Sequence, residues 1–366
     1  VVVADFDGIR TMCQRAIDDG VMPGLALSIA HRGDEPMRCF LGSAALEPVP
    51  RPLTPSTRFD LASLTKCLAT TWLLMRKWEE GLDLDAPLER LLPGYYPPDK
   101  QQLTIRLLMA HAAGLASGLR LLDRFTAADA LIDGTRRRAI ECFLAAEPRE
   151  EPMRDALYSD IGPILVADLL EQLGEERLDH QCQRELYTPT LMHDTIFRHL
   201  TDPLPSPLPS PQECAATERC PWRERVVCGQ VHDENAYLLG GVAGHAGLFA
   251  PLADLERVAA VLLDPPTTGP LTARALGEFT RKQDIVEGSS RAIGWDTARN
   301  GCPGGDRLSA NAFGHTGFTG TSIWIDPELE LSVVMLANRV HPTRDNSAFV
   351  GFRPRLHNAI VDSLRG

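Results

Sequence analysis

The chain has 366 residues, of which 44% are apolar, and a formal net charge of −12. This length is enough to bury a large core, and it is typical of two lobes or of one domain with a large insertion. The acidic balance leaves no basic stripe to neutralise phosphates, which argues against a nucleic-acid partner. The longest uncharged stretch, 236–253, is broken by glycines and a proline and does not predict a membrane span.

The N-terminal part predicts one helix followed by two strands. Residues 5–19 have the apolar spacing of an amphipathic helix that ends at Gly20. The runs 25–31 and 37–46 are rich in strand-forming residues and flank a Gly33-Asp34 turn. That arrangement is typical of a β-hairpin.

The middle of the chain is mainly helical. Apolar residues recur at helical spacing in the segments 64–80, 105–110, 127–145, 161–173 and 175–186. Alternate prolines from Pro203 to Pro211 interrupt this helical pattern and predict an extended loop. We expect this loop, together with the residues up to 235, to lie on the surface, either as a lid over a cleft or as a simple insertion.

Short runs typical of strands return at 292–297, 322–326 and 331–338, and a final helix is predicted at 349–364. Because strands concentrate at both ends and helices lie between them, we expect an α/β (α+β) fold. Its antiparallel sheet is built from both termini and flanked by helices. The expected sheet domain comprises 1–62 and 245–366. The expected helical domain, 63–244, carries the Pro-rich loop 201–235, with the active site between the two.

Nine cysteines are scattered along the chain without paired spacing. They predict reduced, partly buried thiols, with no metal site and no cofactor, and mildly favour a reducing, cytoplasmic compartment. No signal-peptide pattern opens the sequence, but a chain whose signal had been removed would look the same. A periplasmic or secreted location therefore stays an alternative.

The run Ser63-Leu64-Thr65-Lys66 is the strongest indication of chemistry. The chain holds four lysines against 33 arginines, and this lysine stands three residues after a serine. Positions three apart share a helix face, so the Lys66 amine can reach the Ser63 hydroxyl. Unlike arginine, a desolvated lysine can release its proton, and the positive helix end helps to keep it neutral. The pair predicts a serine nucleophile with a lysine base, although a serine cap before a solvated lysine has the same spacing.

Two more motifs follow in the order that such chemistry needs. Tyr158-Ser159-Asp160 precedes a helical run, and a phenol can relay a proton between nucleophile and leaving group. The alternative is a half-buried structural tyrosine. His315-Thr316-Gly317 resembles a strand edge, where a backbone N–H can face an oxyanion while the hydroxyl and imidazole bind a carboxylate or carbonyl. On its own this motif is also typical of a glycine-rich turn.

Together the three motifs resemble the serine β-lactamase and penicillin-binding-protein superfamily, in the branch shared by class C β-lactamases, D-Ala-D-Ala peptidases and related esterases. The family pattern is Ser-x-x-Lys, then Tyr-x-Asn, then Lys/His-Thr-Gly. The segments 59–62 and 107–115 also match. Asp160 stands in place of the usual Asn, and His315 in place of the Lys of efficient β-lactamases. Both departures count against antibiotic hydrolysis as the main activity.

The resemblance implies that Ser63 is the acylated nucleophile, Lys66 its activating base and Tyr158 a second proton carrier. It also implies an oxyanion hole made by the backbone N–H groups of Ser63 and Phe318, and a supporting structural role for His111. The residues that it implies for substrate binding in these motifs are Asp160, His315, Thr316 and Gly317.

The segments 231–236 and 241–249, with 338–342, are similar to one subgroup of these hydrolases, the exo-acting N-acetylmuramoyl-L-alanine amidases. That subgroup acts on cell-wall fragments. The similarity implies that Asp233, His245 and His341 lie close to the substrate. In the alternative, the glycine-rich stretch is a tight packing turn and His245 is a hydrogen-bonded core residue.

The sequence thus predicts a serine hydrolase that works through a Ser-Lys-Tyr acyl-enzyme mechanism, as an amidase or peptidase on peptidoglycan-derived muropeptides. The same machinery suits a carboxylesterase on small acyl esters, a D-Ala-D-Ala carboxypeptidase, a weak class C-type β-lactamase, or a module that binds a β-lactam or peptidoglycan without turnover. The expected partner is a small molecule or a short peptide or muropeptide; neither a nucleic-acid partner nor a membrane span is expected.

Overall fold

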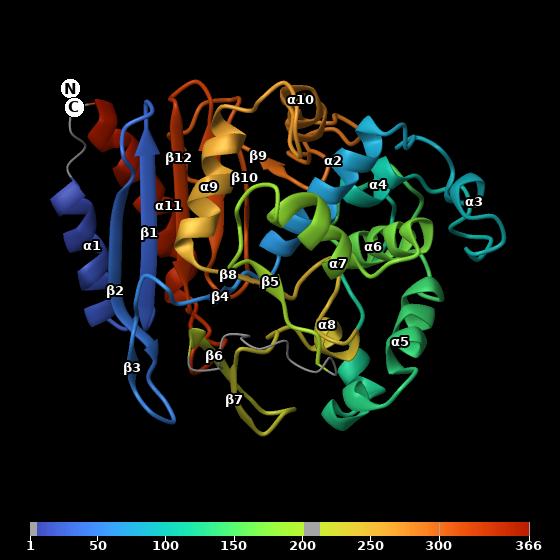
Figure 1. The fold of residues 1–366 in the computed structure, drawn as a ribbon, viewed down its shortest axis with the longest axis horizontal. Coiled ribbons are helices and arrows are strands. Elements are labelled where there is room, and N and C mark those ends of the chain that lie inside the picture. The colour runs from blue at the N-terminus through green and yellow to red at the C-terminus, as the bar shows by residue number, and fades with distance from the viewer. Residues whose placement is uncertain (1–5, 201–212, 300, 366) are drawn as a thin grey trace.

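The computed structural model describes residues 6–200, 213–299 and 301–365. In these residues seven strands form an antiparallel sheet in the order β3-β2-β1-β12-β11-β10-β9 (Figure 1). The β1 strand near the N-terminus pairs with β12 near the C-terminus, and Leu27 lies opposite Met335. This pairing confirms the predicted sheet built from both termini. The strands are β1 (Gly24–His31), β2 (Met37–Ala45), β3 (Arg51–Pro52), β9 (Asp296–Thr297), β10 (Phe313–Thr316), β11 (Ser322–Asp326) and β12 (Leu331–Ala337).

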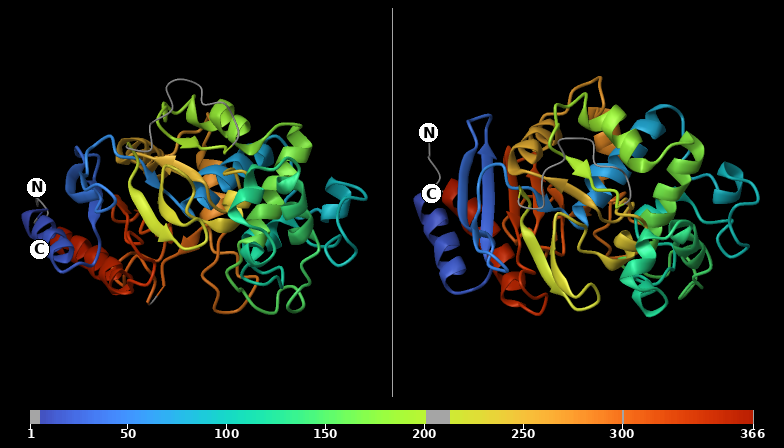
Figure 2. Two further views of the ribbon diagram at one scale, coloured as in Figure 1. Left: turned by 90° about the horizontal axis from the view of Figure 1, so that it is seen from below. Right: turned by 60° about the horizontal axis from the view of Figure 1, so that its bottom comes forward.

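Helices cover both faces of this sheet because successive side chains of a strand point to opposite faces. On one face Leu25, Leu27 and Ile29 pack in a core with α1 (Phe6–Asp18) and α11 (Ala348–Arg365). Figure 2 shows these two helices side by side. The other face packs against α9 (Leu252–Leu263). Each fully buried Leu or Ile contributes about 1.5–3 kcal/mol of transfer free energy to this packing.

A mainly helical region lies beyond α9, on the side of the sheet away from α1 and α11 (Figure 1). Within it, α6 is buried at every position from 161 to 170, which makes it the central helix of this region. The helices here and nearby are α2 (Trp72–Glu79), α3 (Leu88–Leu91), α4 (Ile105–Met109), α5 (Thr135–Leu144), α6 (Ile161–Gly174), α7 (Leu178–Cys182), α8 (Glu234–Leu238) and α10 (Ala273–Thr280).

Short strands connect the two regions. In one small sheet β8 (Leu248–Ala250) pairs with both β4 (Phe59–Asp60) and β5 (Ile196–Phe197). A separate hairpin is formed by β6 (Ala216–Cys220) and β7 (Arg225–Cys228). The small β4-β8-β5 sheet places Asp60 directly before the segment that carries Ser63.

Three predicted elements differ from the structure. The helix expected at 127–145 is interrupted at Gly134, whose φ of 79° is left-handed and cannot occur inside a helix. The strand expected at 292–297 shortens to the two residues of β9, because Gly294 turns the chain with a φ of 74°. The segment up to residue 235, expected on the surface, contains the β6–β7 hairpin, and four of the five residues of β6 are buried. The prolines at 203–211 lie outside the described residues.

The described ranges also show how the helices, the metal-binding residue types and the cysteines are arranged. None of their helices combines the length and apolarity needed to cross a bilayer. They contain no cluster of three His, Cys, Asp or Glu side chains arranged to hold a metal ion. All nine cysteines are free thiols, and all but Cys142 and Cys228 are buried.

Candidate active site

A tight connection after β4 presents Ser63. Asp60 ends that strand, and its carboxylate accepts hydrogen bonds from the backbone N–H of Ala62 at 2.8 Å and of His232 at 2.6 Å. Ala62 has a φ of 47°, a left-handed conformation that is uncommon for a residue with a Cβ. A helical segment follows, with π-type turns at Lys66–Thr71 that lead into α2. Asp60 therefore holds a strained turn immediately before Ser63, as is common at functional sites.

The Lys66 side chain is fully buried and surrounded by acceptors. Its Nζ lies 2.9 Å from Ser63 Oγ, 2.7 Å from Asp160 Oδ1 and 3.3 Å from the carbonyl oxygen of His245. An ammonium group has three N–H donors, which match these three acceptors. Burial lowers the pKa of Lys66, but Asp160 and Tyr158 more than offset that effect and the net pKa is raised. The expectation of a neutral lysine at the helix end is corrected: the half-buried Asp160 carboxylate raises the pKa of Lys66 and keeps it protonated in the resting state.

Tyr158 lies against this pair. Its phenol is close enough to Lys66 and Ser63 for both side chains to lower its pKa. The Lys66 Nζ is 4.9 Å from the centre of the Tyr158 ring, and the Arg291 guanidinium is 5.1 Å from it. Burial raises the pKa of Tyr158, while the Lys66 charge opposes the rise. The Ser63 hydroxyl, the Lys66 ammonium and the Tyr158 phenol therefore lie next to one another.

The His315-Thr316-Gly317 motif forms the end of β10. The Nδ1–H of His315 donates to the Thr316 carbonyl at 2.9 Å, which leaves Nε2 as an acceptor. Burial, with the Lys66 and Arg291 charges, lowers the pKa of His315 to about 3, so the imidazole is neutral. A Cβ at Gly317 would lie 2.1 Å from Thr321 Oγ1 and 2.5 Å from the Leu61 carbonyl oxygen. Glycine is what lets β10 approach the turn before Ser63.

Two residues that line the pocket, Ser63 and Phe318, have backbone N–H groups that donate no hydrogen bond within the described part of the chain. The Phe318 turn is held to the Ser63 turn by Thr319, whose hydroxyl donates to the Asp60 carbonyl at 2.7 Å. Preorganised donors of this kind are suited to an oxyanion.

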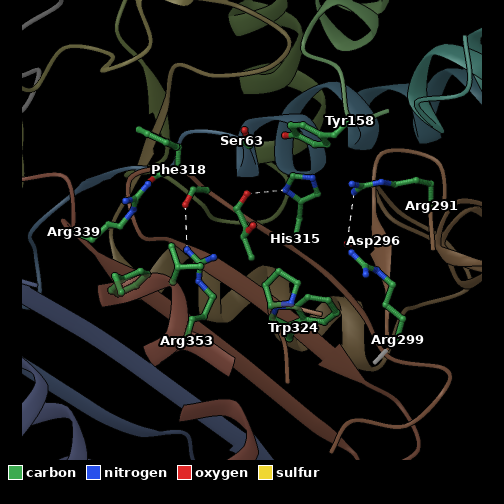
Figure 3. A pocket seen from close by; sticks show the side chains of 15 residues that line it. Ser63, Tyr158, Arg291, Asp296, Arg299, His315, Phe318, Trp324, Arg339 and Arg353 are labelled. Atoms are coloured by element: carbon green, nitrogen blue, oxygen red, sulfur yellow. Dashed lines mark hydrogen bonds and ion pairs between the residues drawn. The ribbon is translucent and has the colours of Figure 1, made fainter. Parts of the chain in front are cut away.

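The pocket at Ser63 has a volume of about 340 Å³ (Figure 3). Arginines from two parts of the chain line it together with the three motifs. They gave no signal in the sequence, because nothing distinguished them among 33 arginines. The four are Arg291, Arg299, Arg339 and Arg353.

Asp233 and His245, which the amidase similarity places close to the substrate, bond each other, and the backbone of His245 reaches Lys66. His245 is buried, and its Nε2 bonds Asp233 Oδ1 at 2.9 Å. The same Asp233 oxygen accepts from the Ala236 N–H at 2.8 Å and caps α8. Neither lines the pocket at Ser63, and His245 contributes its carbonyl oxygen to Lys66. This geometry matches the alternative of a tight packing turn.

His341 does not line that pocket either; it lines a separate hollow. Its Nε2 accepts from the Leu46 N–H at 2.8 Å, and its Nδ1–H donates to the Thr217 carbonyl at 2.7 Å. Both nitrogens are engaged with backbone, so the structure does not bring His341 to the substrate. His111, by contrast, has the supporting position that was expected: its Nδ1 accepts from the Ser159 N–H at 3.1 Å.

Comparison with known proteins identifies the family. The sequence profile described as Beta-lactamase matches residues 9–349. The chain belongs to the beta-lactamase family. A Salmonella gallinarum protein named "Putative D-alanyl-D-alanine carboxypeptidase" is 29% identical over 345 residues, which cover 86% of this chain and 78% of that protein.

Solved structures share the fold. Simvastatin synthase (LovD) from Aspergillus terreus has a TM-score of 0.71 at 18% identity, over 100% of both chains. EstCE1, described as a hydrolase with promiscuous acyltransferase activity, has a TM-score of 0.73 at 20% identity, over 97% of this chain and 98% of its own. With the family match, these structures confirm the resemblance to β-lactamases and penicillin-binding proteins and the mixed α/β fold.

Proposed function

We propose that this beta-lactamase-family hydrolase cleaves amide bonds in peptidoglycan-derived peptides through an acyl-enzyme on Ser63. The observation that carries the proposal is the 2.9 Å contact between Ser63 Oγ and the buried Lys66 Nζ, at the wall of a pocket large enough for a short peptide segment. A serine hydroxyl is a weak nucleophile until a proton acceptor lies within hydrogen-bond reach, and Lys66 becomes that acceptor once the Lys66–Tyr158 pair has lost a proton.

In the proposed reaction Ser63 Oγ attacks the amide carbonyl carbon and loses its proton to the Lys66–Tyr158 pair. The carbonyl oxygen takes up the negative charge and accepts from the Ser63 and Phe318 N–H groups, each worth about 2.7–4 kcal/mol in comparable sites. The C–N bond then breaks, and the pair returns the proton to the leaving amine. Water repeats the steps on the resulting ester and releases Ser63.

The resting charge of Lys66 defines which form of the enzyme reacts. Because Lys66 is an ammonium and the pKa of Tyr158 is raised, the pair must first lose one proton before it can accept that of Ser63. The two groups are in contact, so this loss belongs to the pair rather than to either residue. Asp160 then sets the pH at which the active form appears.

A D-alanyl-D-alanine carboxypeptidase is the second candidate, and the name of the Salmonella relative favours it. The first, a muramoyl-L-alanine amidase, rests on the similarity of the segments 231–249 and 338–342. Both candidates use the same Ser63 chemistry on the same class of polymer fragment. They differ in the bond cleaved and hence in the products.

Mass spectrometry of products from a panel of muropeptides tests the proposal, with Ser63→Ala as the inactive control. Release of free D-alanine from pentapeptides identifies the carboxypeptidase. Release of the whole peptide from N-acetylmuramic acid identifies the amidase. Turnover of p-nitrophenyl esters with every muropeptide left intact would overturn the proposal in favour of a carboxylesterase.

A penicillin pulse followed by intact-mass measurement separates the remaining alternatives. The proposed enzyme forms at most a transient adduct on Ser63. A stable adduct combined with no turnover of any muropeptide would instead indicate a binding module. Rapid multiple turnover of the penicillin would indicate a β-lactamase.

A further inference from the structure

The pocket at Ser63 is strongly positive although the chain is acidic. Its wall contains four arginines and one carboxylate, Asp296, which gives a formal charge of 4 − 1 = +3, since His315 is neutral. The whole chain carries −12. A cleft of one sign within a surface of the other sign focuses the field and concentrates ligands of the opposite charge.

The arginines form two groups on opposite sides of Ser63 in Figure 3. We call Arg339 and Arg353 the Phe318-side arginines, and Arg291 and Arg299 the Tyr158-side arginines. The first group comes from the end of β12 and from α11. The second comes from the segment around β9, so the two groups are fixed by different elements.

The Phe318-side arginines hold their positions through backbone carbonyls. Arg339 Nε donates to the Phe318 carbonyl at 2.7 Å, and Arg353 Nη2 donates to the Gly317 carbonyl at 3.3 Å. In the described part of the chain no carboxylate is paired with either guanidinium, and Arg353 Nε is buried without a hydrogen-bond acceptor. Burial and the neighbouring Arg339 charge lower the pKa of Arg353 to about 9. Two adjacent cations without a counter-ion favour binding of an anion.

The Tyr158-side arginines are partly neutralised. Arg291 Nη1 lies 3.6 Å from Asp296 Oδ2, and Arg299 Nε donates to the Ser290 hydroxyl at 3.0 Å. Asp296 Oδ1 is itself bonded to the Ser290 hydroxyl and the Thr297 N–H. One positive charge remains on this side after Asp296 is counted.

We propose that the substrate carries an acidic group on each side of the scissile bond, one held by the Phe318-side arginines and the other by the Tyr158-side arginines. This inference rests on the proposed function, because it takes Ser63 as the point of attack. It deepens that function by naming the substrate class: dianionic acyl compounds, such as peptides with a carboxylate in both the acyl part and the leaving group. A single-carboxylate substrate would leave one group of arginines without a counter-ion.

A set of four esters tests the proposal without any change to the protein. The acyl group is 4-carboxybutanoyl or its neutral amide, and the leaving group is 3-hydroxybenzoate or 3-hydroxybenzamide. Values of kcat/KM are divided by the uncatalysed rates to remove differences in reactivity. We expect each carboxylate to raise kcat/KM about tenfold at low salt, so that the dianion exceeds the neutral ester about 100-fold, and the advantage to shrink as salt is added. Equal values within threefold, or a preference for either monoanion, would overturn the proposal.

Arginine variants locate the two subsites. Arg353→Gln and Arg339→Gln should reduce the advantage of one carboxylate about tenfold, and Arg291→Gln that of the other. Arg137→Gln is the matched control, because Arg137 is an exposed arginine on α5 whose side chain is 86% accessible. If all three pocket variants kept the parent ratio between dianionic and neutral esters, as the Arg137→Gln control should, the arginines would have only a structural role.

A binding measurement distinguishes failure of this inference from failure of the proposed function. Isothermal titration of the four esters into Ser63→Ala measures recognition without cleavage. Tightest binding of the dianion supports the two subsites even if the parent enzyme forms no acyl adduct, in which case the proposed chemistry fails alone. Equal binding of all four esters to Ser63→Ala, alongside turnover by the parent, overturns the two subsites alone.

Discussion

Lys66 Nζ lies closer to Asp160 Oδ1, at 2.7 Å, than to Ser63 Oγ, at 2.9 Å. The lysine that the nucleophile needs is thus shared with a carboxylate. Loss of the proton from Lys66 breaks an ion pair between a buried ammonium and a half-buried carboxylate, which raises the free energy of the active form. This one relationship connects the unusual residue of the Tyr158-Ser159-Asp160 motif to the pH dependence of the reaction.

Asp160→Asn should shift the pH profile of kcat/KM. Removing the negative charge destabilises the protonated Lys66–Tyr158 pair, so its pKa falls and the active form appears at lower pH. We expect the rising limb to move down by about one to three pH units. Initial rates on a p-nitrophenyl ester between pH 5 and 10 measure the shift, with the exposed Asp123→Asn as control. A limb that moves to higher pH would contradict the role of Asp160.

Lys66→Arg should lower kcat/KM by about 10²- to 10⁴-fold although it keeps the positive charge. A guanidinium does not release its proton at working pH, and it is larger than the enclosed site that Nζ occupies. Lys77→Arg is the matched control, because Lys77 lies at the surface of α2 in ion pairs with Glu80 and Glu185. A parent-like rate for Lys66→Arg would show that no proton passes through this position.

Gly317→Ala should impair both stability and turnover. The added methyl would meet the Leu61 carbonyl oxygen, so β10 or the Ser63 turn must shift. Even a displacement of about 1 Å in a catalytic site costs about 10²-fold in rate. Gly351→Ala is the control: it lies in α11 with open space around it and should gain up to about 1 kcal/mol of stability. Urea unfolding and ester hydrolysis measure the two effects.

His341→Leu should lower stability by about 1–3 kcal/mol, because it leaves the Leu46 N–H and the Thr217 carbonyl without partners. The folded fraction should retain kcat/KM within about twofold, since His341 does not line the pocket at Ser63. Denaturation curves and active-site titration separate the two quantities. A large rise in KM for His341→Leu at unchanged stability would instead indicate that His341 contacts the substrate.

The protein should lose stability as the pH falls below about 6.5, the ordinary pKa of histidine. Burial lowers the pKa of His315 and of His357 to about 3, so both are neutral when folded and gain protons on unfolding. Between those pKa values the unfolded state binds more protons, so acid favours unfolding by about 1.4 kcal/mol per pH unit for each histidine.

The comparison of His357→Leu with the parent at pH 7 and pH 5 tests this prediction. Neither ring nitrogen of His357 has a hydrogen-bond partner among the described residues, so the apolar side chain should stabilise the fold and flatten the pH dependence. His193→Gln, at an exposed position, is the control. An unchanged slope in His357→Leu would contradict a neutral buried histidine.

The sequence by itself determined the family, the antiparallel sheet built from both termini and the residues that meet at Ser63. All three could be predicted from short stretches of the sequence. A helix brings together positions three apart, and alternating apolar residues define a buried strand. The same local reasoning failed at Gly134 and Gly294, where single left-handed residues end an element.

Only the tertiary structure decided the charge of Lys66, the backbone hydrogen bonds of His341 and the gathering of four arginines in the pocket at Ser63. Asp160 lies 94 positions after Lys66 in the chain, since 160 − 66 = 94. A pKa depends on burial and on neighbouring charges in space. Those neighbours come from segments that are brought into contact only when the sheet and the helical region pack together. No local pattern in the sequence predicts these contacts.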